Sequence, residues 1–313
     1  MSSETGRIQI WCWVDGKPGH ENQSLGLLQS LEDRVDCVIH RWKPPVAWFK
    51  RLTWKRRWLE EAATLPAPSL ILGAGHATHF WIRLSRKRFG GQSIVLMRPT
   101  LSSRYDDLLI VPEHDLPRKQ DRMLITRGVL NRIRPGGSHD SGCGLILAGG
   151  PCRHVVWSDQ VVQKQIESLI TSQPQVRWMV TNSRRSPDSM LPFFQNLKQL
   201  ANVDFVSARD TPPGWVASQL AACAQAWVTA DSVSMVYEAI TSGAATGLIE
   251  LEWAARSKLK MGLKTLVQDG LLTPVSQWHA STGLPNQPQI LFEADRVADW
   301  IVRNFLQSQR MDS

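Results

Sequence analysis

Residues 8–23 read IQIWCWVDGKPGHENQ, an apolar run followed by a polar loop that contains two glycines. The apolar run 8–14 predicts a buried β-strand, and the residues from 23 to 31 predict a helix after the loop. A strand, a short glycine-containing loop and a helix in this order are typical of a parallel α/β sheet. We therefore expect the chain to begin with one βα unit of such a sheet.

The same alternation of strand and helix recurs along all 313 residues, in two series. Residues 135–142 (PGGSHDSG) are hydrophilic and rich in turn-forming residues, and this composition is typical of a linker. The sequence predicts an α/β fold of two Rossmann-like domains, 1–138 and 139–292, with a cleft between them and a closing helix within 293–313. Strands are expected at 69–72, 93–97, 107–111, 123–126, 144–147, 176–180, 203–205, 226–228 and 245–249, and helices at 160–172, 190–200, 218–224, 234–242 and 293–307.

The charge of the chain is unevenly distributed. The formal net charge is +8, and residues 1–140 hold 22 Lys and Arg against 14 Asp and Glu, whereas 141–313 hold 14 against 14. A uniformly basic chain would indicate nucleic acid as the partner, whereas an excess confined to one half indicates a single surface for an anionic partner. We therefore do not expect nucleic acid as a partner.

The five cysteines form no C-x-x-C pair, and we expect them to be free thiols in a reducing compartment. With no evident signal peptide and no apolar run long enough to span a bilayer, we expect a cytoplasmic protein, at most peripheral to the membrane.

The first loop carries the candidate catalytic residues. The imidazole of His20 can act as a general base, and Asp15 can orient it or replace it. The two glycines allow a tight turn, and the start of the next helix offers backbone N–H groups to an anion. The alternative interpretation is a simple turn with a solvent-exposed histidine.

Three loops in the second half follow predicted strands and contain groups suited to a diphosphate. Glycines at 149–150 let a phosphate approach the backbone, arginines add charged donors, and the serines of 229–239 (TADSVSMVYEA) stand at a helix start. Glu238 can accept hydrogen bonds from a ribose diol. Exposed turns and ordinary helix capping are the alternatives. The predicted donor-binding residues are Gly149, Gly150, Arg153, Thr181, Ser183, Arg184, Arg185, Asp231, Ser232, Ser234 and Glu238.

Residues 41–58 combine seven Lys and Arg with four tryptophans and Phe49, and contain no acid. This pattern suits an anionic membrane interface. Stacking on nucleic acid, or a helix with its apolar side in the core, remain open alternatives. The sequence has no Asp-x-Asp and no Walker motif, and His76 and His79 have no third ligand nearby, so we expect no metal and no cofactor apart from a nucleotide-sugar substrate.

These segments together resemble the family named for elongated mitochondria in plants (mitochondrial fission), whose bacterial branch is assigned to glycosyltransferases. The matching pieces run in order over nearly the whole chain: 13–23 (WVDGKPGHENQ), 73–76 (GAGH), 149–151 (GGP), 183–185 (SRR) and 229–235 (TADSVSM). The wider resemblance is to GT-B glycosyltransferases, particularly the cell-wall enzyme that adds N-acetylglucosamine to a lipid-linked precursor.

The resemblance implies metal-independent transfer of a sugar from a nucleotide-diphosphate donor, bound by the second domain, to an envelope or lipid-linked acceptor, bound by the first. It also implies a C-terminal helix that crosses back to the first domain, a histidine at the end of the first loop, and a ribose-binding acid at Glu238. Lys17, Asn22 and His76 are then the expected acceptor-binding residues, although Lys17-Pro18 stands where the relatives have glycines. The alternative function is a non-catalytic scaffold that recruits a protein partner to a membrane.

Overall fold

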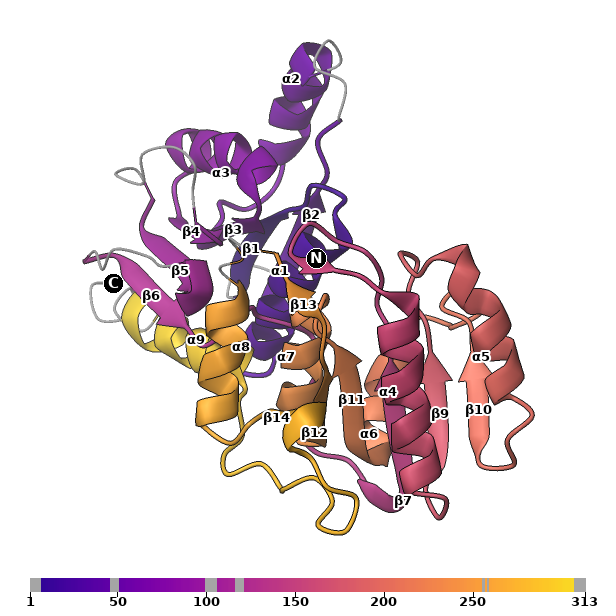
Figure 1. The fold of residues 1–313 in the computed structure, drawn as a ribbon. Coiled ribbons are helices and arrows are strands. Elements are labelled where there is room, and N and C mark those ends of the chain that lie inside the picture. The colour runs from indigo at the N-terminus through magenta and orange to yellow at the C-terminus, as the bar shows by residue number, and fades with distance from the viewer. Residues whose placement is uncertain are drawn as a thin grey trace. The chain divides into compact units, whose positions relative to one another are not determined.

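The computed structural model describes residues 7–45, 51–98, 106–115, 121–254, 257 and 259–306. The chain divides into two compact units, one comprising Met1–Arg132 with Glu293–Ser313 and the other Ile133–Phe292. Each unit contains a parallel sheet with helices, as Figure 1 shows, and the predicted α/β fold with two Rossmann-like domains is confirmed. Within the described residues, no helix is both long and apolar enough to cross a membrane.

Unit 1 is built on six parallel strands in the order β2-β1-β3-β4-β5-β6. The chain adds β2 on one side of β1 and β3 on the other, so the strand order reverses between β1 and β3. Loops at the carboxyl ends of the strands flanking such a switch point form the usual ligand site of an open α/β sheet. The strands are β1 (Ile8–Trp13), β2 (Cys37–Trp42), β3 (Leu70–Ala74), β4 (Gln92–Leu96), β5 (Leu108–Pro112) and β6 (Met123–Thr126).

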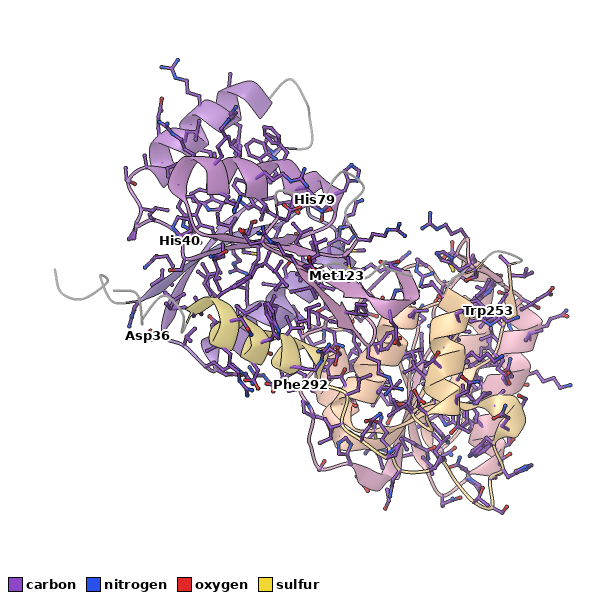
Figure 2. The ribbon with its side chains drawn as sticks, turned by 90° about the vertical axis from the view of Figure 1, so that its left-hand side faces the viewer. Asp36, His40, His79, Met123, Trp253 and Phe292 are labelled. Atoms are coloured by element: carbon purple, nitrogen blue, oxygen red, sulfur yellow. A yellow bond between two sulfur atoms is a disulfide. The ribbon has the colours of Figure 1, made fainter. Side chains whose placement is uncertain are left out.

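Helices cover both faces of this sheet because alternate strand residues point to opposite sides. Ile10 and Cys12 pack with α1 (Pro18–Glu32) and α9 (Glu293–Ile301), which continues as a π-helical turn over Val302–Leu306. Trp11 and Trp13 pack with α2 (Arg51–Ala62) and α3 (His76–Phe89) on the other face. Figure 2 shows α9, in pale yellow, on one side of the sheet and the helix that carries His79 on the other. Helix α9 thus belongs to unit 1, although the residues before it belong to unit 2.

Unit 2 has six parallel strands in the order β10-β9-β7-β11-β12-β14, so its switch point lies between β7 and β11. The strands are β7 (Asp140–Leu147), β9 (Arg177–Thr181), β10 (Val203–Val206), β11 (Cys223–Thr229), β12 (Ala245–Ile249) and β14 (Thr273–Pro274), with an antiparallel pair β8 (Val155–Val156) and β13 (Glu252–Trp253). The helices are α4 (Asp159–Ser172), α5 (Leu191–Leu197), α6 (Trp215–Ala222), α7 (Val233–Ser242) and α8 (Leu259–Gln268).

Two boundaries differ from the sequence prediction. Helix α1 begins at Pro18 rather than at residue 23, because proline suits the first helical position, and His20 therefore lies in the first helical turn. The predicted linker 135–142 is part of unit 2, and the boundary between the units in the sequence lies between Arg132 and Ile133. Gly136 N donates to Ser242 O at 3.1 Å, and Gly137 lies so close to the backbone of α6 that a Cβ would come within 2.0 Å of a carbonyl oxygen.

The expectation of five free thiols is wrong for two of them. Cys143 and Cys223 form a disulfide, with Cα atoms 4.7 Å apart and a sequence separation of 80. The pairing of β7 with β11 brings these cysteines side by side, and no local spacing reveals such a pairing. Cys12, Cys37 and Cys152 are free.

Candidate functional site

The loop after β1 places an aspartate–histidine pair at the carboxyl edge of the unit 1 sheet. His20 Nδ1 and Asp15 Oδ2 are 2.8 Å apart, the Asp15 side chain is 4% exposed, and that of His20 is 22% exposed. Asp15 Oδ1 accepts a hydrogen bond from Lys17 N at 3.0 Å, which fixes the carboxylate. A carboxylate beside Nδ1 favours the tautomer protonated there and leaves Nε2 as the acceptor. The pair has the arrangement of an oriented general base.

This pair packs on the turn that begins α3. Gly75 has φ of +83°, and a Cβ at this position would lie 2.2 Å from His20 Nδ1 and 3.1 Å from Asp15 Oδ2. Only glycine combines this backbone conformation with the close approach of the imidazole. Because Gly75 follows β3 and Asp15 follows β1, the pair lies at the switch point of the sheet. The sequence singled out Gly75 only as part of the GAGH segment of the family resemblance, and the contact shows why glycine stands there.

The three predicted acceptor-binding residues lie in the same part of unit 1. Lys17 is exposed at the N-cap of α1, and His76 is exposed as the first residue of α3, directly after Gly75. Asn22 is half-buried in α1, one turn beyond the start of the helix.

Three further residues at the carboxyl edge were not predicted from the sequence. After β4, Met97 has φ of +74°, a conformation that costs free energy in a non-glycine residue and is common at functional sites. After β5, burial raises the pKa of Glu113, and nearby Glu293 adds to this, while Arg127 opposes it. Burial likewise lowers the pKa of His114. Their only signal in the sequence is their position directly after a strand.

In unit 2, the carboxylate of Asp231 joins the loops at the switch point. Its side chain is fully buried, and Oδ2 accepts from Gly150 N at 3.0 Å and from Arg185 Nη2 at 2.7 Å. Thr229 Oγ1 donates to Oδ1 at 2.6 Å and accepts from Gly149 N at 2.7 Å. The two glycine N–H groups expected to face a phosphate therefore bond to side chains of the protein. A Cβ at Gly149 would lie 2.2 Å from both carboxylate oxygens, so glycine is required there.

Arg185 extends this arrangement to the loop after β9. Its Nη1 donates to Gly150 O at 3.0 Å, and its side chain is 43% exposed. Ser183 Oγ accepts from Arg185 N at 3.0 Å, and Thr181, the last residue of β9, is buried. The structure thus brings five predicted residues into one hydrogen-bonded group that connects the ends of β7, β9 and β11. They are Gly149, Gly150, Ser183, Arg185 and Asp231.

The remaining predicted donor-binding residues in the loops of unit 2 differ in their access to solvent. Arg153, Arg184 and Ser234 are exposed, whereas Ser232 and Glu238 are half-buried on α7 and its N-cap. The Ser232 side chain forms no capping hydrogen bond. Arg153 Nε donates to His154 Nε2 at 3.1 Å, and burial together with this cation lowers the pKa of His154.

Comparisons with known proteins relate this chain to one sequence family and to a set of solved structures. The model of the family described as mitochondrial fission ELM1 matches residues 18–305. No curated protein sequence matches this chain significantly.

Among solved structures, MurG from Acinetobacter baumannii is 13% identical with a TM-score of 0.53, and the match covers 95% of this chain and 99% of MurG. The UDP-GlcNAc 2-epimerase from Methanocaldococcus jannaschii is 8% identical with a TM-score of 0.62, over 95% of this chain and 100% of the epimerase. The UDP-GlcNAc 2-epimerase from Neisseria meningitidis, bound to UDP-GlcNAc, is 10% identical with a TM-score of 0.57, and the match covers 96% of this chain and 100% of that epimerase. At these identities the likeness establishes the fold.

Proposed function

The chain belongs to the mitochondrial fission ELM1 family, and from this premise we propose that it is a GT-B glycosyltransferase acting on a nucleotide-diphosphate sugar. The observation that carries the proposal is the buried Asp15 carboxylate 2.8 Å from His20 Nδ1, at the switch point of unit 1. The shared fold with an enzyme whose structure contains UDP-GlcNAc supports a nucleotide sugar as the donor. The acceptor is a hydroxyl of a cell-envelope or lipid-linked glycan.

In this proposal each unit supplies one half of the chemistry. His20 Nε2 takes the proton of the acceptor hydroxyl while Asp15 stabilises the imidazolium that forms. The new bond joins the acceptor oxygen to the anomeric carbon, and the bond from that carbon to the diphosphate oxygen breaks, so the nucleoside diphosphate leaves with the negative charge. Lys17, Asn22 and His76 line the acceptor side.

Unit 2 binds the nucleotide and stabilises the leaving group. Arg153, Arg184 and the start of α7 provide positive charge for the diphosphate, and Glu238 accepts hydrogen bonds from the ribose hydroxyls. Asp231 and Arg185 act as positioning residues, because each is the other's ion-pair partner and both hold the loop at Gly150.

We also propose an electrostatic contact between unit 1 and an anionic membrane. Within the segment 41–58, the tryptophans at 42, 54 and 58 contact other rings of the core, so the described part of the segment offers charge to a membrane. Trp48 and Phe49 lie outside the described residues. Among the residues of this segment whose side chains the structure describes, the exposed cations are Arg41, Lys43, Arg56 and Arg57.

Calorimetric titration with UDP, GDP and CMP, with and without EDTA, tests the donor site. We expect one nucleotide to bind saturably in the presence of EDTA, and Glu238→Ala to weaken that binding. His20→Ala should bind the same nucleotide normally and lose transfer. If no nucleotide binds, the proposed activity is wrong, and a scaffold that recruits a protein partner becomes the better interpretation.

A further inference from the structure

Two lysines belong to the surroundings of the loop that carries the Asp15–His20 pair: Lys43 packs against Gly16, and Lys17 is part of the loop. Val14 N donates to Trp42 O at 2.9 Å, which continues the pairing of β1 with β2 and sets Lys43 beside the Asp15 loop. Lys43 Cε and Nζ both lie 3.0 Å from the position that a Cβ on Gly16 would occupy. Gly16 has φ of +83°, so the loop turns at the point where the lysine approaches it. Lys17 is the next residue, and both lysines are exposed.

The ammonium groups of these lysines have no acidic partner among the described residues. The Asp15 carboxylate, two residues before Lys17, is 4% exposed and bonds to His20 and to the backbone N of Lys17. None of the ion pairs in the described part of the chain includes Lys17 or Lys43. The loop that carries the pair thus has one lysine side chain against it and a second lysine within it, and positive charges on one stretch of surface attract an anion.

We propose that Lys17 and Lys43 bind a phosphate group of the acceptor, next to the hydroxyl that His20 deprotonates. This inference rests on the proposed function and adds the chemical class of the acceptor, a phosphorylated molecule. Lysine ammonium groups are compact point charges that bind phosphate, whereas the planar fork of arginine suits a carboxylate equally well. The lysines thereby place the acceptor relative to His20.

The test follows the imidazole signals of His20 by NMR while methyl phosphate is added at constant ionic strength. Constant ionic strength keeps general screening from mimicking a site. The signals, assigned with a His20→Gln variant, should shift saturably in the unmodified protein. The double variant Lys17→Gln/Lys43→Gln should weaken this binding about tenfold, since two charged contacts are lost.

The matched control is Lys87→Gln/Arg88→Gln, which removes the same charge from exposed residues in the last turn of α3. Its affinity for methyl phosphate should stay within about twofold, because these side chains lie at the other end of the helix. Equal weakening in the control, no saturable shift, or equally tight binding of acetate would each overturn the inference.

Two further experiments complete the test. The first distinguishes a lipid headgroup from a water-soluble phosphate, and the second distinguishes failure of the phosphate site from failure of the donor site. Vesicles of phosphatidylcholine with phosphatidic acid replace methyl phosphate, and vesicles with a sulfated lipid at the same surface charge control for the general membrane contact, which also uses Lys43. Binding that depends on both lysines with phosphatidic acid but not with the sulfated lipid identifies a lipid headgroup as a source. Lysine-dependent binding of methyl phosphate without such vesicle binding identifies a water-soluble phosphate. UDP calorimetry on Lys17→Gln/Lys43→Gln should match the unmodified protein, so a failed donor site and a failed phosphate site give different results.

Discussion

Replacing Asp231 by alanine should destabilise unit 2 by about 4 kcal/mol. The buried N–H of Gly150 and the buried hydroxyl of Thr229 lose a charged acceptor, at about 1.5–2 kcal/mol for each hydrogen bond. The ion pair with Arg185 adds less than about 1 kcal/mol, because the arginine side chain is 43% exposed and solvent screens its charge. Asp231→Asn keeps the side-chain volume and one hydrogen-bond acceptor, so its loss in the free energy of unfolding should be about half as large.

Urea unfolding of the full chain measures this loss, with hydrogen exchange of peptides from residues 133–292 to assign the change to unit 2. The assignment is needed because two units can unfold in separate transitions. Asp204→Ala, at an exposed position of β10, is the matched control and should stay within about 0.5 kcal/mol. A loss below about 1 kcal/mol in Asp231→Ala would show that the carboxylate does not hold the loops together.

Four further changes test other parts of the structure. Gly75→Ala should cost about 2 kcal/mol or more in urea unfolding and should break the bond of His20 to its carboxylate, seen as a shifted ring proton by NMR, because the added Cβ has no space and φ is +83°. Burial lowers the pKa of His79, so protonation of the unfolded chain should reduce stability as the pH falls below about 6.5, and His79→Leu should flatten the urea midpoint against pH. Burial raises the pKa of Cys12 to about 12, so iodoacetamide at pH 8 should leave it unmodified in the folded protein, as mass spectrometry would show. Arg34→Ala removes contacts of 2.7 and 2.6 Å to two aspartates of α9 and should speed hydrogen exchange in 293–301, with little change elsewhere.

The local pattern of apolar and polar residues was sufficient to predict the strands and the loops that follow them. The run 8–14 is apolar on both faces because both faces of β1 are covered, and every predicted strand has a counterpart in one of the two sheets. Strand β2 was not predicted, and its residues are mostly half-buried at the sheet edge, where apolar pattern is weak. The disulfide was missed because Cys143 and Cys223 are joined only by strand pairing.

The sequence by itself determined the fold class, the positions of the loops and the residue types that they offer, because strand and helix periodicity and turn chemistry are local properties of the chain. Only the tertiary structure decided which of those residues meet. The contacts of His20 with Gly75, of Asp231 with Gly150, and of Lys43 with the loop at Gly16 join residues far apart in sequence. The order of the strands brings them together, and strand order follows from the burial of the whole sheet, which no single segment encodes.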